Sequence, residues 1–318
     1  MPIDLAGHMT APIALGQHLR VAPPATSANL GPGFDSFGLA LEFRDELRVR
    51  TAKHTRVTLA GEGAGQLPRD ESHLIVRKIR EYWEARGAQP VGIELEAVNR
   101  IPHARGMGSS AAAIVAAYAA ADALLPAELR GGTEAVFQAA AAWEGHPDNV
   151  APAVYGGLSI SLTNPEGSFT AHRVPVHCSV RAVLAVPEAG LSTEVARGVL
   201  PQAVPHAVAA ANSARAALLV HALATDPAQL LAGTEDFLHQ HYRAKAMPES
   251  SALLARLRGE GLAAVISGAG PTVLVLVADN TQLGQAAQLI EAFNATSTGS
   301  WRCEIPAIAS TGVTVEEL

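Results

Sequence analysis

Cysteine is nearly absent from this sequence: only Cys178 and Cys303 occur among 318 residues, and they lie far apart along the chain. Two distant thiols cannot form a disulfide framework, and a cysteine metal site needs a cluster of thiols. The sequence therefore excludes a small secreted domain held by disulfides and a metal centre built from cysteine. The low cysteine content fits a protein of the reducing cytoplasm.

Positive charge is also scarce. The chain has 23 Lys and Arg against 30 Asp and Glu, which gives a formal net charge of -7. Nucleic acids and anionic membrane surfaces attract basic proteins, so this balance argues against both as the main partner. A small anion is still compatible with this charge, because backbone N–H groups and a few arginines bind phosphate without a basic surface.

Long apolar runs are missing too, although 48% of the residues are hydrophobic. A membrane-spanning helix needs about 18 to 20 consecutive apolar residues, and the alanine-rich stretch after Ser110 is interrupted by Asp122. The first ten residues, MPIDLAGHMT, have neither the basic start nor the apolar core of a secretory leader. We therefore expect a soluble chain without a membrane segment.

Strand-like and helix-like patterns alternate along the whole chain, which predicts an α/β or α+β protein. The length favours two lobes, and we place an N-terminal domain over 18–170 and a C-terminal domain over 171–318. The patterns predict strands over residues 18–23, 38–51, 56–61, 91–98, 153–162, 181–187, 263–268, 272–278 and the tail from Trp301. They predict helices over residues 72–86, 110–125, 133–143, 193–200, 205–224, 234–243, 249–259 and 281–295.

The stretch IPHARGMGSSAAAIVAAYAA, residues 101–120, places two glycines and two serines directly before an alanine-rich helix. Gly106 and Gly108 let the backbone approach a ligand closely, and the first turn of a helix has free N–H groups. The helix dipole adds partial positive charge there. Ser109 and Ser110 offer hydroxyls to phosphate or to Mg²⁺. The stretch predicts an anion site, and the alternative is a serine-capped helix after a flexible turn.

Two better-known phosphate loops do not fit this stretch. The P-loop pattern is absent because no lysine follows Gly108. Gly106, Gly108 and Ala111 satisfy the dinucleotide pattern G-x-G-x-x-A. That fold, however, needs a parallel strand soon after the helix, and here a second alanine-rich helix is predicted instead. A nicotinamide enzyme is therefore disfavoured.

Two further glycine-rich stretches stand out. PPATSANLGPGFDSFGLAL, residues 23–41, predicts a turn between strands. Its Asn29 and Asp35 lie six residues apart around a Gly-Pro-Gly bend, so both side chains can face one cleft. ISGAGPTVLVLV, residues 266–277, predicts a glycine-rich hairpin between apolar strands, which by itself is only a tight turn.

Taken together, PATSANLGPGFDSFG, PHARGMGSSAAA and SGAGPT resemble, in order, the three motifs of the GHMP kinase superfamily. The runs ATSANLGPGFD and WEGHPDNVAPAVYGGL are most similar to the branch that phosphorylates the side-chain hydroxyl of L-homoserine, a step towards threonine. The resemblance extends from Leu19 to the C-terminus. It implies a two-lobed α+β fold, with a phosphate loop in the N-terminal α/β lobe and a ferredoxin-like C-terminal lobe. A kinase for another small alcohol and a catalytically silent ligand sensor with this fold stay open.

The resemblance also assigns the nucleotide and metal sites. ATP and Mg²⁺ are the implied cofactors, with Ser110 and Glu144 as metal ligands and catalytic residues. The implied ATP-binding residues form the loop Pro102, His103, Ala104, Arg105, Gly106, Met107, Gly108, Ser109, Ser110, Ala111 and Ala112. Where the family often has NLI at the helix that meets adenine, this chain has HLI with His73. An imidazole lacks the paired donor and acceptor of a carboxamide, so adenine contact by His73 is left open.

An amino-acid site needs arginine for a carboxylate, because the planar guanidinium can bind it through two hydrogen bonds. Thr193 and Arg197 are four residues apart and share a face if they lie on a helix. The resemblance assigns Arg197 and Arg243 to the carboxylate of homoserine, and Asn29 and Asp35 to its amino group and hydroxyl. It places the following additional residues in the substrate site: His146, Asn149, Thr193, Gly268 and Gly270.

Asp148 is the counterpart of an aspartate that takes the hydroxyl proton in some superfamily members. Direct transfer of this proton to the γ-phosphate is the competing hypothesis, since phosphoryl transfer depends chiefly on positioning and charge neutralisation. The resemblance also makes a homodimer plausible. The partners implied are thus ATP, L-homoserine and a second copy of the chain.

Overall fold

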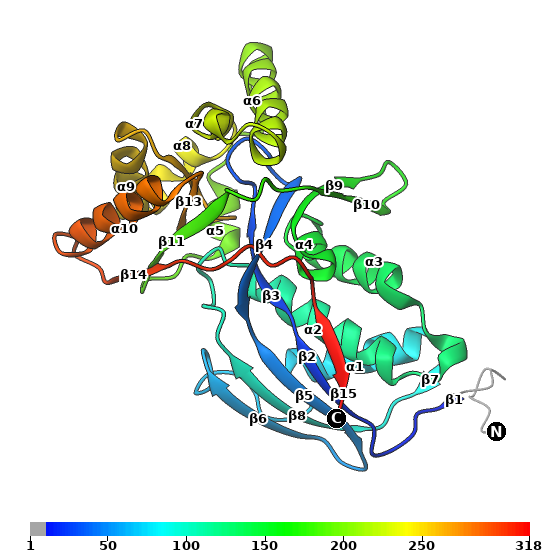
Figure 1. The fold of residues 1–318 in the computed structure, drawn as a ribbon. Helices are drawn as coiled ribbons and strands as arrows, with labels where there is room; N and C mark the ends of the chain where they lie inside the picture. Colours follow the sequence, from blue (N-terminus) through cyan, green and yellow to red (C-terminus); the bar gives the residue numbers. More distant parts are fainter. Residues whose placement is uncertain (1–10) are drawn as a thin grey trace.

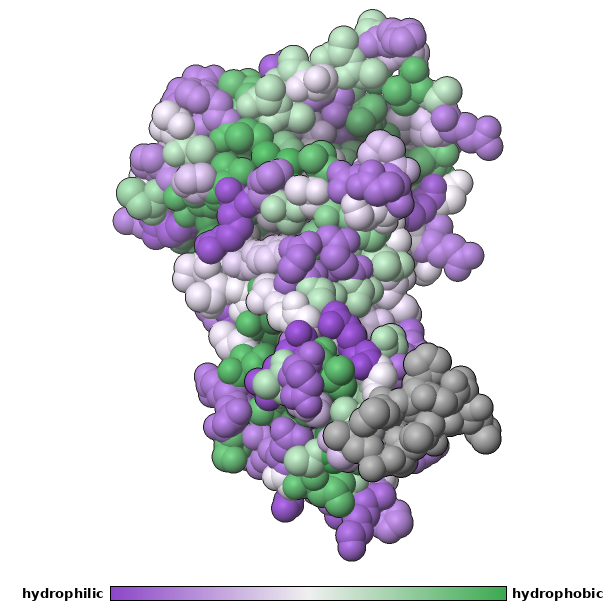
Figure 2. Space-filling model, turned by 90° about the vertical axis from the view of Figure 1, so that its right-hand side faces the viewer, coloured by the Kyte–Doolittle hydropathy of each residue, from purple (hydrophilic) through white to green (hydrophobic). Residues whose placement is uncertain are grey.

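The computed structural model describes residues 11–318, so the N-terminal segment MPIDLAGHMT lies outside the described residues. Two lobes lie one above the other, each built on its own antiparallel or mixed sheet (Figure 1). Figure 2 shows the narrower waist between them, on a face where hydrophilic and hydrophobic residues are interspersed. The two-lobed α+β fold expected from the sequence is confirmed.

The N-terminal lobe contains a five-stranded sheet. Its strands are β15 (Thr314–Glu317), β2 (His18–Ala22), β5 (Glu46–Ala52), β8 (Gly92–Asn99) and β6 (Arg56–Gly61), in that spatial order. Only the β6–β8 pair is parallel. In β5, Leu47 and Val49 are buried while Arg48 and Arg50 are exposed, so one face of the sheet is apolar. Helices α1 (Leu74–Ala85), α2 (Ser109–Leu124) and α3 (Gly132–Glu144) cover that face (Figure 1).

The alanine run of the sequence is explained by the burial of α2. Twelve of its residues are buried, on every side of the helix, as is typical of a helix in the middle of a core. Alanine side chains are small enough for α1 and α3 to pack closely against both sides of α2. Trp83 of α1 donates from Nε1 to the Ala121 carbonyl, 2.9 Å away, which fixes the two helices together.

A second sheet of the N-terminal lobe has the order β10-β9-β4-β3. Its strands are β3 (Pro24–Ala28), β4 (Phe37–Arg44), β9 (Leu158–Thr163) and β10 (Phe169–Val174). Two expectations were wrong here. Residues 24–28 were expected in a turn but form β3, and residues 153–155 were expected in a strand but belong to helix α4 (Val150–Tyr155). Gly156, with φ of +76°, ends α4 and lets the chain enter β9.

The C-terminal lobe has an antiparallel sheet with the order β12-β13-β11-β14. These strands are β11 (Arg181–Pro187), β12 (Ala263–Ile266), β13 (Val273–Val277) and β14 (Trp301–Glu304). Helices α9 (Pro248–Gly259) and α10 (Asn280–Asn294) precede β12 and follow β13. This order of strands and helices is that of a ferredoxin-like fold, as the sequence analysis expected.

The helix predicted over residues 234–243 is wrong for most of its length. Only α8 (Gln240–Arg243) is helical, because the Asp236 carboxylate accepts the backbone N–H groups of Leu238, His239 and Gln240 and turns the chain. The shorter elements are β1 (Ala11–Pro12), β7 (Ala88–Gln89), α5 (Thr193–Gly198), α7 (Leu230–Gly233) and the 3₁₀ turns Ala127–Leu129, Pro227–Gln229 and Ala244–Ala246.

Among residues 11–318, the helix α6 (His206–Ala224) has the length and mean hydropathy of a membrane crossing. A single helix of this kind is weak evidence for a membrane protein. Polar contacts also fasten α6 to the fold: Asn212 donates to the Pro32 carbonyl at 2.8 Å, and Arg215 pairs with Glu235 at 2.6 Å. These contacts fix α6 to residues of both lobes.

A shared apolar core joins the two lobes. Leu39 and Met107 of the N-terminal lobe are buried in one cluster with Leu184, Leu219 and Leu274 of the C-terminal lobe. The last strand, β15, also returns to the N-terminal sheet and pairs with β2. Packing, rather than a linker, therefore fixes one lobe against the other. The domain boundary at residue 170 stays a prediction.

We predict that Asp45 stabilises the segment that enters the glycine-rich loop. Asp45 is 5% exposed, and its Oδ1 accepts the backbone N–H groups of Arg100 and Ile101 at 2.6 and 2.8 Å. Asp45→Ala leaves both donors without an acceptor and should cost about 2 to 4 kcal/mol of unfolding free energy, measured by urea denaturation. Asp45→Asn keeps the accepting oxygen and should cost clearly less. Equal losses in the two variants would contradict this role.

Candidate active site

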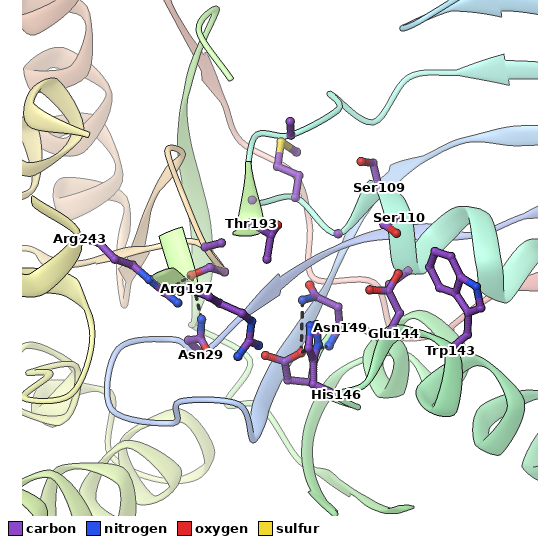
Figure 3. Close-up of a pocket in the computed structure, with 18 residues that line it drawn as sticks. Asn29, Ser109, Ser110, Trp143, Glu144, His146, Asn149, Thr193, Arg197 and Arg243 are labelled. Atoms are coloured by element: carbon purple, nitrogen blue, oxygen red, sulfur yellow. Dashed lines mark hydrogen bonds and ion pairs between the residues drawn. The ribbon is translucent and has the colours of Figure 1, made fainter. Parts of the chain in front are cut away.

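A cavity of about 720 Å³ lies between the lobes and is lined by residues of both. Figure 3 shows its two ends. Arg197, Arg243 and Asn29 lie at one end, and Ser109, Ser110, Glu144 and Trp143 lie at the other. The cavity therefore places a cationic end and a loop with free backbone N–H groups within one continuous space.

The glycines of the loop before α2 are required by close contacts. Gly106 and Gly108 have φ of +70° and +68°, in the left-handed region that favours glycine. A Cβ atom on Gly106 would lie 2.2 Å from the Ser267 carbonyl oxygen, and one on Gly108 would lie 1.9 Å from Thr26 Oγ1. Any larger residue at either position would thus push apart elements that form the cavity.

The start of α2 is open to a ligand. Its N-cap residue is Gly108, and no side chain caps the helix, so the alternative of a serine cap does not apply. The first bond within the helix runs from the N–H group of Ala112 to the Gly108 carbonyl at 2.8 Å. The N–H groups of Ser109, Ser110 and Ala111 make no hydrogen bond to residues 11–318, so they are free for an anion. An exposed Ser110 hydroxyl lies beside them.

Glu144, the last residue of α3, meets the start of α2 in the cavity. Its Oε1 is buried and has no hydrogen-bond partner among the described residues. Burial raises the pKa of this carboxyl group, because the charged form loses contact with water. An unpartnered carboxylate oxygen beside a hydroxyl is a donor set that Mg²⁺ prefers, with further positions left for water and phosphate oxygens. These residues therefore fit a magnesium ion.

A hydrogen-bonded network crosses the middle of the cavity. Asp148, 2% exposed, accepts at Oδ1 from His146 Nδ1 at 3.0 Å and from the backbone N–H of Asn149 at 2.8 Å. The bond to Asp148 raises the pKa of the His146 imidazole. Asn149 Oδ1 accepts from the Thr26 hydroxyl at 2.8 Å. Asp148 Oδ2 makes no hydrogen bond to residues 11–318, so one carboxylate oxygen is left for a ligand.

At the cationic end, Arg197 and Asp35 form an ion pair with two hydrogen bonds, 2.7 and 3.2 Å long. Asn29 donates from Nδ2 to the Gly268 carbonyl at 2.8 Å and accepts at Oδ1 from the Asp35 N–H at 2.9 Å. The buried Arg243 donates to the same Gly268 carbonyl at 3.2 Å. One carbonyl thus orients an amide and a guanidinium that both line the cavity.

The cavity gathers most of the expected site residues. It is lined by Asn29, Ala104, Gly106, Met107, Gly108, Ser109, Ser110, Ala111, Glu144, His146, Asp148, Asn149, Thr193, Arg197, Arg243 and Gly268. The expected residues outside its lining are Pro102, His103, Arg105, Ala112, Asp35 and Gly270. Asp35 still contacts the lining, because its carboxylate pairs with Arg197. The carbonyl of Arg105 accepts from the N–H group of Thr272, which joins the loop to the C-terminal lobe.

Two lining residues were missed by the sequence analysis, Trp143 and Ala269. Trp143 is 40% exposed, and the Lys78 ammonium lies 5.4 Å from its ring centre. The feature of the sequence that could have indicated Trp143 is its position directly before Glu144. His73 does not line the cavity. It is 4% exposed, and burial lowers the pKa of its imidazole.

Comparison with known proteins defines the class. The N-terminal domain of GHMP kinases matches residues 73–157, and their C-terminal domain matches residues 210–296. A mevalonate diphosphate decarboxylase from Staphylococcus aureus shares the fold, with a TM-score of 0.68 at 16% identity over 95% of this chain and 98% of that one. The fold and the glycine-rich loop at the start of α2 are those of a GHMP kinase.

More similar relatives narrow the class. The homoserine kinase of Streptomyces coelicolor is 50% identical over 86% of this chain and 89% of its own length. That of Clavibacter michiganensis is 46% identical over 97% of both chains. The crystal structure of a homoserine kinase from Cytophaga hutchinsonii matches with a TM-score of 0.84 and 25% identity, over 95% of this chain and 98% of that one. The chain belongs to the homoserine kinase family.

A substitution of Gly108 has two costs, the steric contact with Thr26 and the strain of a left-handed backbone, and they can be measured separately. Gly87 has a similar φ of +71° but open space around a Cβ position, so Gly87→Ala should cost only the left-handed strain, about 1 to 2 kcal/mol. Gly108→Ala should cost roughly 1 to 3 kcal/mol more, because it displaces the buried Thr26 hydroxyl from Asn149. Denaturant unfolding measures both losses.

In a Thr26→Ala background the hydroxyl is gone, so the extra cost of Gly108→Ala should shrink towards that of Gly87→Ala. A loss that is the same with and without Thr26 would contradict the assigned contact.

Proposed function

We propose that this chain transfers the γ-phosphoryl group of ATP to the side-chain hydroxyl of L-homoserine and forms O-phospho-L-homoserine, a step of threonine biosynthesis. The observation that carries the proposal is the single cavity that joins the free N–H groups at the start of α2 to Arg197 and Arg243. A triphosphate and an amino-acid carboxylate are both anions, and each end of the cavity suits one of them. Membership of the homoserine kinase family supports the same substrates.

On this proposal the loop from Pro102 to Ala112 surrounds the phosphates of ATP. The backbone N–H groups of α2 bind phosphate oxygens, and Ser110 and Glu144 hold Mg²⁺. When bound, the ion neutralises charge on the β- and γ-phosphates. Residues of the loop outside the cavity lining, such as Pro102 and Ala112, shape the backbone rather than touch the nucleotide.

The amino acid occupies the cationic end. Arg197 and Arg243 bind its carboxylate, Asp35 and Asn29 receive its amino group and hydroxyl, and the rest of the pocket wall is formed by His146, Asn149, Thr193, Gly268 and Gly270. The ion pair between Arg197 and Asp35 opens as the substrate binds, because the carboxylate and ammonium of homoserine replace each partner.

Asp148 is the proposed acceptor of the hydroxyl proton. Its Oδ1 is held by His146 and Asn149, which fixes the carboxylate and leaves Oδ2 as the oxygen that can accept a proton. Direct transfer of the proton to the γ-phosphate is the alternative, in which Asp148 only orients the hydroxyl. In both cases catalysis depends on holding the hydroxyl and the phosphate in line.

Two other functions are weaker candidates. A GHMP kinase for a small alcohol without a carboxylate would not need two arginines beside a buried amide at one end of the cavity. A silent ligand sensor would not need Glu144, whose buried Oε1 has no partner among the described residues. We further propose that the protein is cytoplasmic, in keeping with its two free cysteines, and that it forms a homodimer.

The substrate is tested with purified protein, ATP, Mg²⁺ and a panel of alcohols that includes L-homoserine, mevalonate, L-serine and a sugar. We expect ADP formation with L-homoserine at a kcat/KM far above that of the other alcohols, because only homoserine offers a carboxylate, an ammonium and a hydroxyl at the right spacing. Coupled detection of ADP measures the rates. No ADP above background with homoserine, together with turnover of another alcohol, would show that the substrate is wrong.

The role of Glu144 is tested by Glu144→Gln, which keeps the shape of the side chain but removes its charge. We expect kcat/KM to fall by a factor of about 100 or more, with partial recovery at high Mg²⁺, because a charged metal ligand is lost. Glu128→Gln, on an exposed 3₁₀ turn, is the matched control and should keep full activity. Full activity of Glu144→Gln at low Mg²⁺ would refute the assignment.

A further inference from the structure

Arg243 is an unusual cation because it is 1% exposed and takes part in none of the ion pairs of residues 11–318. Neutral acceptors hold it instead. Its Nε donates to the Ala196 carbonyl at 3.0 Å, and its Nη1 donates to the Gly268 carbonyl at 3.2 Å and to His239 Nδ1 at 3.0 Å. Arg243 also lines the cavity, where its Nη2 makes no hydrogen bond to the described residues. The guanidinium is thus fixed in place by neutral acceptors, with no carboxylate of the described residues in direct contact with it.

The contacts of His239 fix its tautomer. The Gly31 carbonyl lies 2.8 Å from Nε2, and a carbonyl can only accept, so Nε2 carries a hydrogen. The Arg243 guanidinium lies 3.0 Å from Nδ1, and it can only donate, so Nδ1 carries none. His239 is therefore a neutral imidazole between a loop carbonyl and the guanidinium. Burial lowers the pKa of His239; the nearby Asp236 carboxylate opposes this shift, and the positive charge of Arg243 adds to it.

The surroundings of His239 keep it in this role. The imidazole is fully buried and stacks on Phe34, with ring centres 5.2 Å apart, and the Arg243 guanidinium lies 5.6 Å from the centre of the same Phe34 ring. The Asp236 carboxylate is 3.5 Å from Nε2, on the side away from Arg243, and it is already bonded to backbone N–H groups. A carboxylate in the place of His239 would neutralise Arg243 and compete with an anionic ligand. A neutral acceptor does neither.

We propose that His239 is a positioning residue for the substrate: it holds the Arg243 guanidinium as a neutral acceptor, so that the full charge of Arg243 meets the carboxylate of the amino acid. This inference rests on the proposed function. It makes recognition of the carboxylate depend on a residue that does not line the cavity itself.

Two variants divide the contacts of His239 between them. In His239→Asn, the side-chain oxygen reaches the place of Nδ1 and can still accept from Arg243. In His239→Gln, the side-chain N–H reaches the place of Nε2 and can still donate to Gly31, but the acceptor for Arg243 is lost. Each variant loses one hydrogen bond, so a purely structural role predicts similar defects in both.

The measurements are kcat, KM for L-homoserine, KM for ATP and the inhibition constant of 3-aminopropan-1-ol, which is homoserine without its carboxylate. For His239→Gln we expect the KM for homoserine to rise about tenfold, the loss typical of a hydrogen bond to a charged group. The KM for ATP and the inhibition constant of 3-aminopropan-1-ol should stay within about twofold, and His239→Asn should recover most of the KM for homoserine. Equal KM values in the two variants, or an equal rise for 3-aminopropan-1-ol, would overturn the proposal.

Should His239→Gln fail to fold, ¹⁵N NMR of histidine-labelled wild-type protein gives an independent test, with His239→Asn used for assignment. We expect a neutral Nε2–H tautomer whose Nδ1 signal shifts when homoserine binds but not when 3-aminopropan-1-ol binds. A protonated Nδ1 at neutral pH would overturn the proposal. The proposed function fails separately, if the wild-type protein does not phosphorylate homoserine at all.

Discussion

The Ser267 hydroxyl is the contact on which the geometry of the site depends. It lies 2.6 Å from the Gly106 carbonyl and 2.8 Å from the Ser27 hydroxyl. Because a hydroxyl carries one hydrogen, Ser267 donates to the carbonyl and accepts from Ser27. The next residue, Gly268, donates from its N–H to the Ala28 carbonyl and accepts from Asn29 and Arg243. One turn of the C-terminal lobe therefore sets both the glycine-rich loop before α2 and the cationic end of the cavity.

The site also explains how an acidic protein can offer two separate places to anionic groups. The net charge of -7 describes the whole surface, whereas binding depends on the local field in the cavity. There, free N–H groups of α2 and the guanidinium groups of Arg197 and Arg243 provide positive potential at separate places. Glu144 lies at the α2 end of the cavity, and its buried Oε1 has no hydrogen-bond partner among the described residues. The cavity thus contains charged and polar groups that bound ligands would pair with.

The sequence predicted the glycine-rich loops because local sterics leave few alternatives to glycine at positions such as Gly106 and Gly108. The alanine-rich run also predicted α2, whereas the ferredoxin-like lobe was expected only from the resemblance to GHMP kinases. The sequence analysis missed β3, whose Thr26 and Ser27 resemble turn residues but are buried for hydrogen bonds to distant parts of the chain. It also missed the turn at Asp236, where the side-chain carboxylate accepts backbone N–H groups that would otherwise bond to carbonyls within a helix. Contacts across long separations, such as Asp35 with Arg197, leave no local pattern to recognise.

The two arginines of the cationic end differ in a way that suits a zwitterionic amino acid. The side chains of Arg197 and Asp35 are 37% and 35% exposed, and an ion pair of this kind contributes about 1 kcal/mol or less. A ligand with both a carboxylate and an ammonium can replace the pair at little cost, since each side chain exchanges one partner for another. A ligand with a single charge would leave Arg197 or Asp35 uncompensated. Arg243, in contrast, is buried and held by neutral acceptors, so its position does not depend on the exposed pair.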